Sequence, residues 1–129
     1  MTQNKPRLLI VDDDILTIDF LVDTLKDDYS LFIAKEGETA LELAMRHRPD
    51  VILLDIIMPG IDGYQLLSYL KNLDELQHTA IVLVSSLVSE SHQELAFELN
   101  PDAYLKKPLD ADKVLFCVQA QLEKMAKRD

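Results

Sequence analysis

Glycine and cysteine are scarce in this chain of 129 residues. The glycines are Gly37, Gly60 and Gly63, and none of them forms a G-x-G-x-x-G or Walker phosphate loop. The single cysteine, Cys117, has no partner in the chain with which to form a disulfide, and no zinc-type Cys/His spacing is present. The sequence therefore disfavours nucleotide-binding folds that depend on such loops, disulfide-rich scaffolds and zinc modules.

Basic residues are also few, because 13 Lys and Arg stand against 23 Asp and Glu, which gives a formal net charge of −10. Phosphate backbones and anionic lipids repel a chain this acidic, so direct nucleic-acid or membrane binding is disfavoured. No apolar run is long enough to cross a bilayer, and the polar segment 1–7 lacks the apolar centre of a signal peptide. We therefore expect a cytoplasmic protein.

Short apolar runs alternate with amphipathic segments along the whole chain, whose length suits one domain. Several runs, such as Leu8–Val11 and Val51–Leu54, are continuously apolar, as is typical of strands buried on both faces of a parallel sheet. Strict alternation of strand and helix predicts a doubly wound α/β fold. Strands are expected at 8–11, 30–34, 51–54, 80–84 and 103–105, and helices at about 15–25, 38–47, 64–71, 89–99 and 110–127.

Polar residues follow four of the five expected strands. They are Asp12, Asp13 and Asp14 after the first strand, Asp55 after the third, Ser85 and Ser86 after the fourth, and Lys106 and Lys107 after the fifth. Parallel strands bring their carboxyl ends to one edge of a sheet, where ligands of open α/β folds bind. We therefore expect three carboxylates, a hydroxyl and a lysine to face one small cleft.

Crowded carboxylates repel one another unless a cation lies between them, and Mg²⁺ prefers such oxygen ligands. A lysine and a hydroxyl beside the metal suit phosphoryl transfer, with an aspartate carboxylate as nucleophile. Taken singly, these residues have plainer interpretations: helix caps for Asp12–Asp14, a turn for Asp55, and surface groups for Ser85 and Lys107. Those interpretations do not explain why all of them gather at one edge.

Four motifs carry a family resemblance: L-L-I-V-D-D-D at 8–14, V-I-L-L-D-I-I-M-P-G-I-D-G at 51–63, I-V-L-V-S-S at 81–86 and D-A-Y-L-K-K-P-L at 102–109. Together and in this order they resemble the receiver domain of two-component response regulators, over about residues 7–125. The resemblance implies a flavodoxin-like (βα)5 fold with a five-stranded parallel sheet of order 2-1-3-4-5. It also implies a single receiver domain over 1–129.

The resemblance implies a role for each motif residue. Asp55 corresponds to the phosphoacceptor; Asp12, Asp13, Asp55 and the backbone carbonyl of Ile57 to ligands of Mg²⁺ or Mn²⁺; Lys107 to the phosphate-binding lysine; Ser85 and Tyr104 to the switch pair. The Lys107–Pro108 bond is expected to be cis. Such a domain catalyses its own phosphorylation and dephosphorylation and is not a conventional enzyme.

The expected partner is a histidine kinase or phosphotransfer protein that donates the phosphoryl group. Phosphorylation would then shift the domain between two states and change the face formed by the fourth helix, fifth strand and fifth helix. This face is also where a phosphorylation-dependent homodimer would form. The polar helix that ends at 129 has no cap, which suggests truncation before an output domain.

Two other interpretations remain open. The first is a receiver-like scaffold that works without phosphate, although none of Asp13, Asp55, Ser85 and Lys107 is missing. The second is a phosphohydrolase with an aspartate nucleophile, but such enzymes commonly have a D-x-D pair and here Ile57 takes the second position. The apolar Ile57 also predicts a slowly hydrolysed acyl phosphate, because its side chain is placed to shield the bond from water.

Helix periodicity predicts which further side chains are buried. The first helix is expected to bury Ile15, Ile18, Leu21, Val22 and Leu25, and the last to bury Cys117 with Val114, Val118 and Leu122. His47, His78 and His92 lie far apart in the sequence, and we expect them to be solvated, without a metal or catalytic role.

Overall fold

The computed structural model describes residues 5–57, 63–86 and 98–128, and in that part five parallel strands form one sheet of order β2-β1-β3-β4-β5. The strands are β1 (Arg7–Val11), β2 (Ser30–Ala34), β3 (Val51–Asp55), β4 (Ala80–Ser85) and β5 (Ala103–Lys106); the helices are α1 (Ile15–Leu25), α2 (Gly37–His47), α3 (Gly63–Asn72) and α5 (Ala111–Arg128), with a 3-10 turn at Asp74–Leu76. The predicted fold and strand order are confirmed. The helix predicted at 89–99 lies almost wholly outside the described residues.

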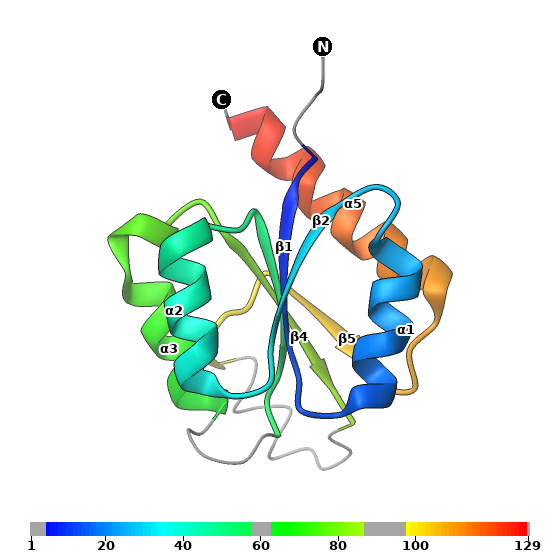
Figure 1. Ribbon diagram of the computed structural model, residues 1–129. Helices are drawn as coiled ribbons and strands as arrows, with labels where there is room; N and C mark the ends of the chain where they lie inside the picture. Colours follow the sequence, from blue (N-terminus) through cyan, green and yellow to red (C-terminus); the bar gives the residue numbers. More distant parts are fainter. Residues whose placement is uncertain (1–4, 58–62, 87–97, 129) are drawn as a thin grey trace.

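Helices cover both faces of the sheet, with α2 and α3 on one side and α1 and α5 on the other (Figure 1). Alternate residues of each strand serve the two layers. Leu9, Ile52 and Leu54 pack on the α2–α3 side, whereas Leu8 and Leu53 pack on the α1–α5 side. Because both faces are covered, β3 and β4 are buried at every position, which explains their uninterrupted apolar sequences.

Aspartate side chains begin two of the helices, as the sequence predicts. Asp14 Oδ1 accepts a hydrogen bond from Leu16 N (3.1 Å), and Asp110 Oδ1 accepts one from Asp112 N (2.9 Å). The C-terminal end of α2 is capped by Arg48, whose φ of 45° lies in the left-handed region that glycine prefers.

Glycine is required at the start of α3. A Cβ on Gly63 would overlap the carbonyl oxygen of Ile56 and lie 2.7 Å from its carbonyl carbon. Both neighbours are backbone atoms, so neither can move away by changing rotamer. Gly63 thus lets α3 approach the segment that directly follows Asp55.

Two carboxylates at the amino ends of the strands serve the sheet itself. Asp50 precedes β3 and accepts a hydrogen bond from Arg7 N (2.8 Å), and Asp102 precedes β5 and accepts one from Ile81 N (2.7 Å). These bonds satisfy backbone donors that would otherwise lack a partner at the strand starts.

Several burial predictions need correction. Ile15 is 51% exposed, whereas Ile18, Leu21 and Leu25 are buried as predicted. Val22, Cys117 and Leu122 are only half-buried, whereas Val114 and Val118 are fully buried.

The histidines also differ from one another. His47 stacks on Phe32 with ring centroids 4.0 Å apart instead of extending into solvent, while His78 is exposed as predicted and His92 lies outside the described residues. Within the described residues, none of the helices combines the length and apolar character that crossing a membrane requires.

Candidate active site

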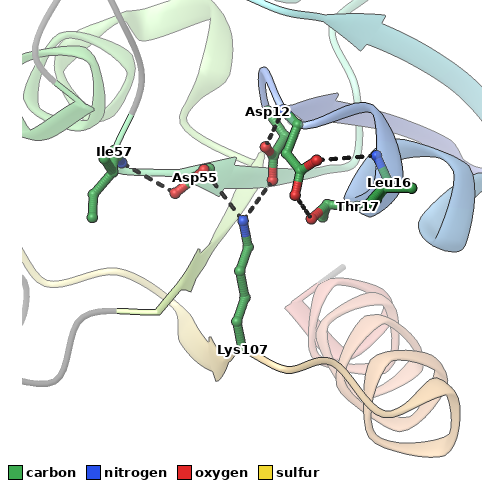
Figure 2. A network of polar contacts seen from close by, with 7 residues as sticks. Asp12, Leu16, Thr17, Asp55, Ile57 and Lys107 are labelled. Carbon is green, nitrogen blue, oxygen red and sulfur yellow. Dashed lines mark hydrogen bonds and ion pairs between the residues drawn. The ribbon is translucent and has the colours of Figure 1, made fainter.

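One lysine joins two buried carboxylates at the carboxyl edge of the sheet. Lys107 Nζ lies 3.1 Å from Asp12 Oδ2 and 3.3 Å from Asp55 Oδ2 (Figure 2). Asp12 directly follows β1 and is 1% exposed, and Asp55 is the last residue of β3 and is 5% exposed. The gathering of side chains that the sequence predicts at this edge is therefore present.

The strand register explains how these residues meet. Asp55 and Ser85 are the last residues of β3 and β4, one position beyond the predicted strand ends, and they pair with Val84 and Lys106. Lys107 follows at once, with its N–H donating to Ser85 O at 2.9 Å. Pairing between neighbouring strands therefore fixes the backbone positions of Asp55, Ser85 and Lys107.

Backbone N–H groups orient both carboxylates in the same way. Asp55 Oδ1 accepts from Ile57 N at 3.1 Å, and Asp12 Oδ1 accepts from Asp14 N at 2.9 Å. Each aspartate thus has one oxygen held by the chain that follows it and the other directed at the ammonium of Lys107. This arrangement brings Oδ2 of both aspartates to the same ammonium group.

A third carboxylate completes an acidic cluster. Oxygen atoms of Asp12, Asp13 and Asp55 all lie within 4.8 Å of one another, and Asp13 is exposed while the other two are buried. Hard divalent cations such as Mg²⁺ and Mn²⁺ bind carboxylate oxygens and commonly retain several waters. The donor set therefore fits such an ion, with Asp13 on the solvent side.

Burial and neighbouring charges change the pKa values of Asp55 and Lys107 in this cluster. Burial, followed by the charge of Asp12, raises the pKa of Asp55 to about 6 from its ordinary 3.8, against the opposing effects of Ile57 N–H and Lys107. Burial lowers the pKa of Lys107, but the carboxylates of Asp55 and Asp12 outweigh it, so this pKa is raised. Two carboxylates share one ammonium, which leaves the cluster short of positive charge.

The remaining predicted residues lie around this cluster. Ser85 is fully buried, and Tyr104 is half-buried on the α2–α3 side of the sheet with its hydroxyl oxygen buried. The side chain of Ile57 is 55% exposed beside Asp55, and the Lys107–Pro108 peptide bond is cis, as expected.

The sequence did not predict the exposed apolar side chains that follow the acidic residues of the first strand. Leu16, at the start of α1, is 76% exposed, and Ile15 beside it is 51% exposed. Both directly follow Asp13 and Asp14. One signal was available for Leu16, because it lies off the apolar stripe of its helix.

A sequence profile described as the response regulator receiver domain matches residues 8–119. The chain belongs to this family. Receiver domains of this family are the signalling modules of two-component systems, and this receiver domain has the acidic cluster and lysine described above.

Two curated relatives illustrate the range of receiver proteins. The polar-differentiation response regulator DivK of Brucella anthropi is 29% identical over 116 residues, which cover 89% of this chain and 94% of DivK. Response regulator PleD of Caulobacter vibrioides is 36% identical over 111 residues, which cover 85% of this chain but only 24% of PleD. The receiver domain thus spans nearly all of one relative and about a quarter of the other.

Solved structures show the same fold. The CheY-like receiver domain protein from Methanospirillum hungatei JF-1 has a TM-score of 0.89 at 24% identity, over 98% of this chain and all of that one. The signal receiver domain of a modulated diguanylate cyclase from Desulfovibrio desulfuricans G20 has a TM-score of 0.85 at 27% identity, again over 98% of this chain and all of that one.

Proposed function

We propose that this receiver domain accepts a phosphoryl group on Asp55 from the phosphohistidine of a kinase or phosphotransfer protein. The observation that carries the proposal is the shared contact of Lys107 with Asp12 and Asp55 beside a third carboxylate. A structural ion pair needs one carboxylate for one lysine. The excess of buried acid at a solvent-accessible edge is instead suited to binding a cation and a phosphoryl group.

In this proposal an Asp55 carboxylate oxygen attacks phosphorus in line with the leaving imidazole. The new O–P bond forms as the P–N bond breaks, and the electron pair of that bond stays on the histidine nitrogen. The product is an acyl phosphate on Asp55. Because the nucleophile must be ionised, the contact of Lys107 with Asp55 favours the reactive form of the carboxylate.

Lys107 and Ser85 are the proposed ligands of the phosphoryl oxygens. Lys107 already lies at hydrogen-bond distance from Asp55, and its charge opposes the negative charge that accumulates during transfer. Asp12, Asp13, Asp55 and the carbonyl of Ile57 are the proposed ligands of Mg²⁺ or Mn²⁺. When bound, the ion supplies charge neutralisation for the phosphoryl oxygens.

The exposed apolar residues beside the cleft support docking of a protein donor. Ile15, Leu16 and Ile57 are all more than half exposed next to the acidic cluster. An apolar rim around a polar centre suits a protein partner that must approach the cleft closely. We propose that the kinase or phosphotransfer protein, acting in the cytoplasm, covers these side chains.

For the response we propose that the phosphoryl group draws the Ser85 hydroxyl toward it and that Tyr104 then changes position; the segment after Ser86 lies outside the described residues. The described part of the output face is β5 with α5. There an apolar groove of about 580 Å³ includes Leu105 and Phe116, and Phe116 is 75% exposed. This face is the proposed site of contact with an output domain or a second phosphorylated copy.

Intact mass spectrometry after incubation with acetyl phosphate tests the proposal. We expect one phosphoryl adduct that requires Mg²⁺ and is absent from Asp55→Asn. Asp19→Asn, an exposed carboxylate on α1, is the matched control and should be labelled like the wild type. An adduct that persists in Asp55→Asn would contradict the assignment of the acceptor.

A wild-type protein that forms no adduct would next be tested with a panel of phosphorylated histidine kinases. Failure of both donors, together with no Mg²⁺-dependent change in thermal stability, would favour the phosphate-independent scaffold. The lifetime of the adduct tests Ile57 separately. We expect Ile57→Asn to shorten it, and an unchanged lifetime would show that this side chain does not shield the bond.

A further inference from the structure

The edge of the sheet opposite Asp55 has a cavity of its own, about 500 Å³ in volume. It lies at the amino ends of the strands, the edge at which β1 begins and α5 ends in Figure 1. The end of α3 contributes Lys71, the segment before β4 contributes His78, and the last turns of α5 contribute Gln121 and Lys124. The phosphoryl chemistry proposed above uses none of these residues.

Gln121 is the most informative residue in this cavity. Four buried polar residues occur in the described part of the chain, and three of them, Asp12, Asp55 and Ser85, belong to the phosphoacceptor site. The fourth is Gln121, which is 6% exposed and makes no side-chain hydrogen bond with any described residue. The amide itself is not cut off from solvent, so a ligand or water in the cavity that Gln121 lines can form a hydrogen bond with it.

The charge of the cavity is opposite in sign to that of the whole chain. Its wall includes Lys71 and Lys124, with His78 beside them, against one carboxylate, Asp102. Lys71 Nζ lies 3.7 Å from Asp102 Oδ2, and that same oxygen already accepts the hydrogen bond from Ile81 N. Lys124 forms no ion pair with any described residue, so its charge is available to a ligand.

Apolar side chains form another part of the wall, namely Leu76, Leu99 and Met125. A second cavity of about 560 Å³ also reaches Met125 and brings Arg7 and Arg48 to the same edge. Sites for small molecules are commonly of this size. The wall of the first cavity is mainly polar, which suits a charged ligand.

We propose that the cavity binds a small organic anion, with a phosphate or carboxylate group between Lys71 and Lys124 and its apolar body against Leu76 and Met125. The Gln121 amide then gains the hydrogen-bond partner that it lacks among the described residues. The site is separate from Asp55, so the proposal does not depend on phosphorylation.

Nuclear magnetic resonance of ¹⁵N-labelled protein tests this at constant ionic strength and without Mg²⁺. The probes are AMP, inorganic phosphate and adenosine, which separate the charged group from the apolar body. We expect AMP to shift the side-chain amide of Gln121 and the backbone amides of Thr79 and Lys124 saturably, with phosphate weaker and adenosine weakest. Localised shifts absent with both AMP and phosphate, or adenosine binding as tightly as AMP, would overturn the proposal.

Variants identify the groups that recognise the anion. Lys124→Gln and Gln121→Leu should each weaken AMP binding by about tenfold, because each removes a charged or directed hydrogen-bond group. Gln121→Leu should keep at least the melting temperature of the wild type, which shows that its loss of binding is not unfolding. Lys113→Gln, an exposed lysine near the other end of α5, should bind AMP like the wild type. An equal loss in that control would mean general attraction to lysines and would overturn the site.

Discussion

Carboxylates at the two edges of the sheet have different roles. At the amino edge, Asp50 and Asp102 accept backbone N–H groups of β1 and β4, and Asp102 also has Lys71 beside it. At the carboxyl edge, Asp12 and Asp55 are buried together and share one ammonium. The carboxylates at the first edge satisfy backbone donors of the strands, whereas at the second edge burial and the charge of Asp12 raise the pKa of Asp55. The two pairs differ in burial as well as in location, since Asp50 and Asp102 are only half-buried.

The largest effect on stability is expected at Gly63, the first residue of α3. Gly63→Ala should lower the free energy of unfolding by about 3 kcal/mol, because the new Cβ meets the backbone of Ile56 and forces the segment after Asp55 to move. Urea unfolding measures this. Gln65→Ala, an exposed change on the same helix, should remain within about 0.5 kcal/mol of the wild type.

Removing the charge of Asp55 should stabilise the metal-free protein. Since the pKa of Asp55 is raised to about 6 from 3.8, ionising this group in the folded state costs up to about 3 kcal/mol above pH 7. Asp55→Asn should therefore be more stable than the wild type at pH 8, and the difference should decrease as the pH falls through 6 and vanish near 4. Urea unfolding with EDTA at several pH values measures this, and a difference that does not vary with pH would contradict it.

Lys107 should matter far more for phosphoryl transfer than its neighbour. Lys107→Met should slow adduct formation from acetyl phosphate by about 100-fold, because it removes the cation at hydrogen-bond distance from Asp55. Lys106→Met, which changes an exposed lysine one position earlier, should leave the rate within about twofold. Equal effects in both variants would show that overall charge, not the position of Lys107, controls the rate.

At the amino edge, removal of a carboxylate should have the opposite sign. Asp102→Ala should destabilise the protein by about 1–2 kcal/mol, because Ile81 N–H loses its acceptor. Thermal and urea unfolding at pH 8 allow direct comparison with Asp55→Asn. If Asp102→Ala and Asp55→Asn changed stability in the same direction, carboxylates at the two edges would not have different effects on stability.

The smallest effect is expected at the end of α2. Arg48→Gly should raise stability by about 1 kcal/mol, because glycine adopts the left-handed conformation found there without steric cost. Arg46→Gly, two residues earlier and inside the helix, should lower it by a similar amount. Thermal unfolding of the two variants distinguishes the backbone effect from loss of a positive charge.

Most of the fold, and the gathering of Asp12, Asp55 and Lys107 at one edge, could be predicted from the sequence. The pattern of apolar residues locates the strands, and the carboxyl ends of parallel strands lie at the same edge of a sheet. The pattern did not show that Asp55 and Ser85 are the last residues of their strands, since pairing with a neighbouring strand sets those ends. It also grouped Ile15 with the apolar face of the first helix, although Ile15 is 51% exposed.

The cavity around Gln121 could not be predicted. In the sequence, Gln121 is one polar residue in a polar helix, and only the packing of α5 against the sheet reveals its burial. Lys71, His78 and Lys124 come from three separate segments, and no motif links them.

Gly63 has a consequence for genetics. Every base change in a glycine codon that alters the amino acid adds a Cβ, so position 63 should be as intolerant as Asp55 in a survey of variants scored by signalling output. The same survey scored by cellular abundance would separate them: variants at 63 would be degraded, whereas Asp55→Asn would accumulate. Intolerance to mutation at this edge therefore identifies a reactive residue only when the silent protein is still present in the cell.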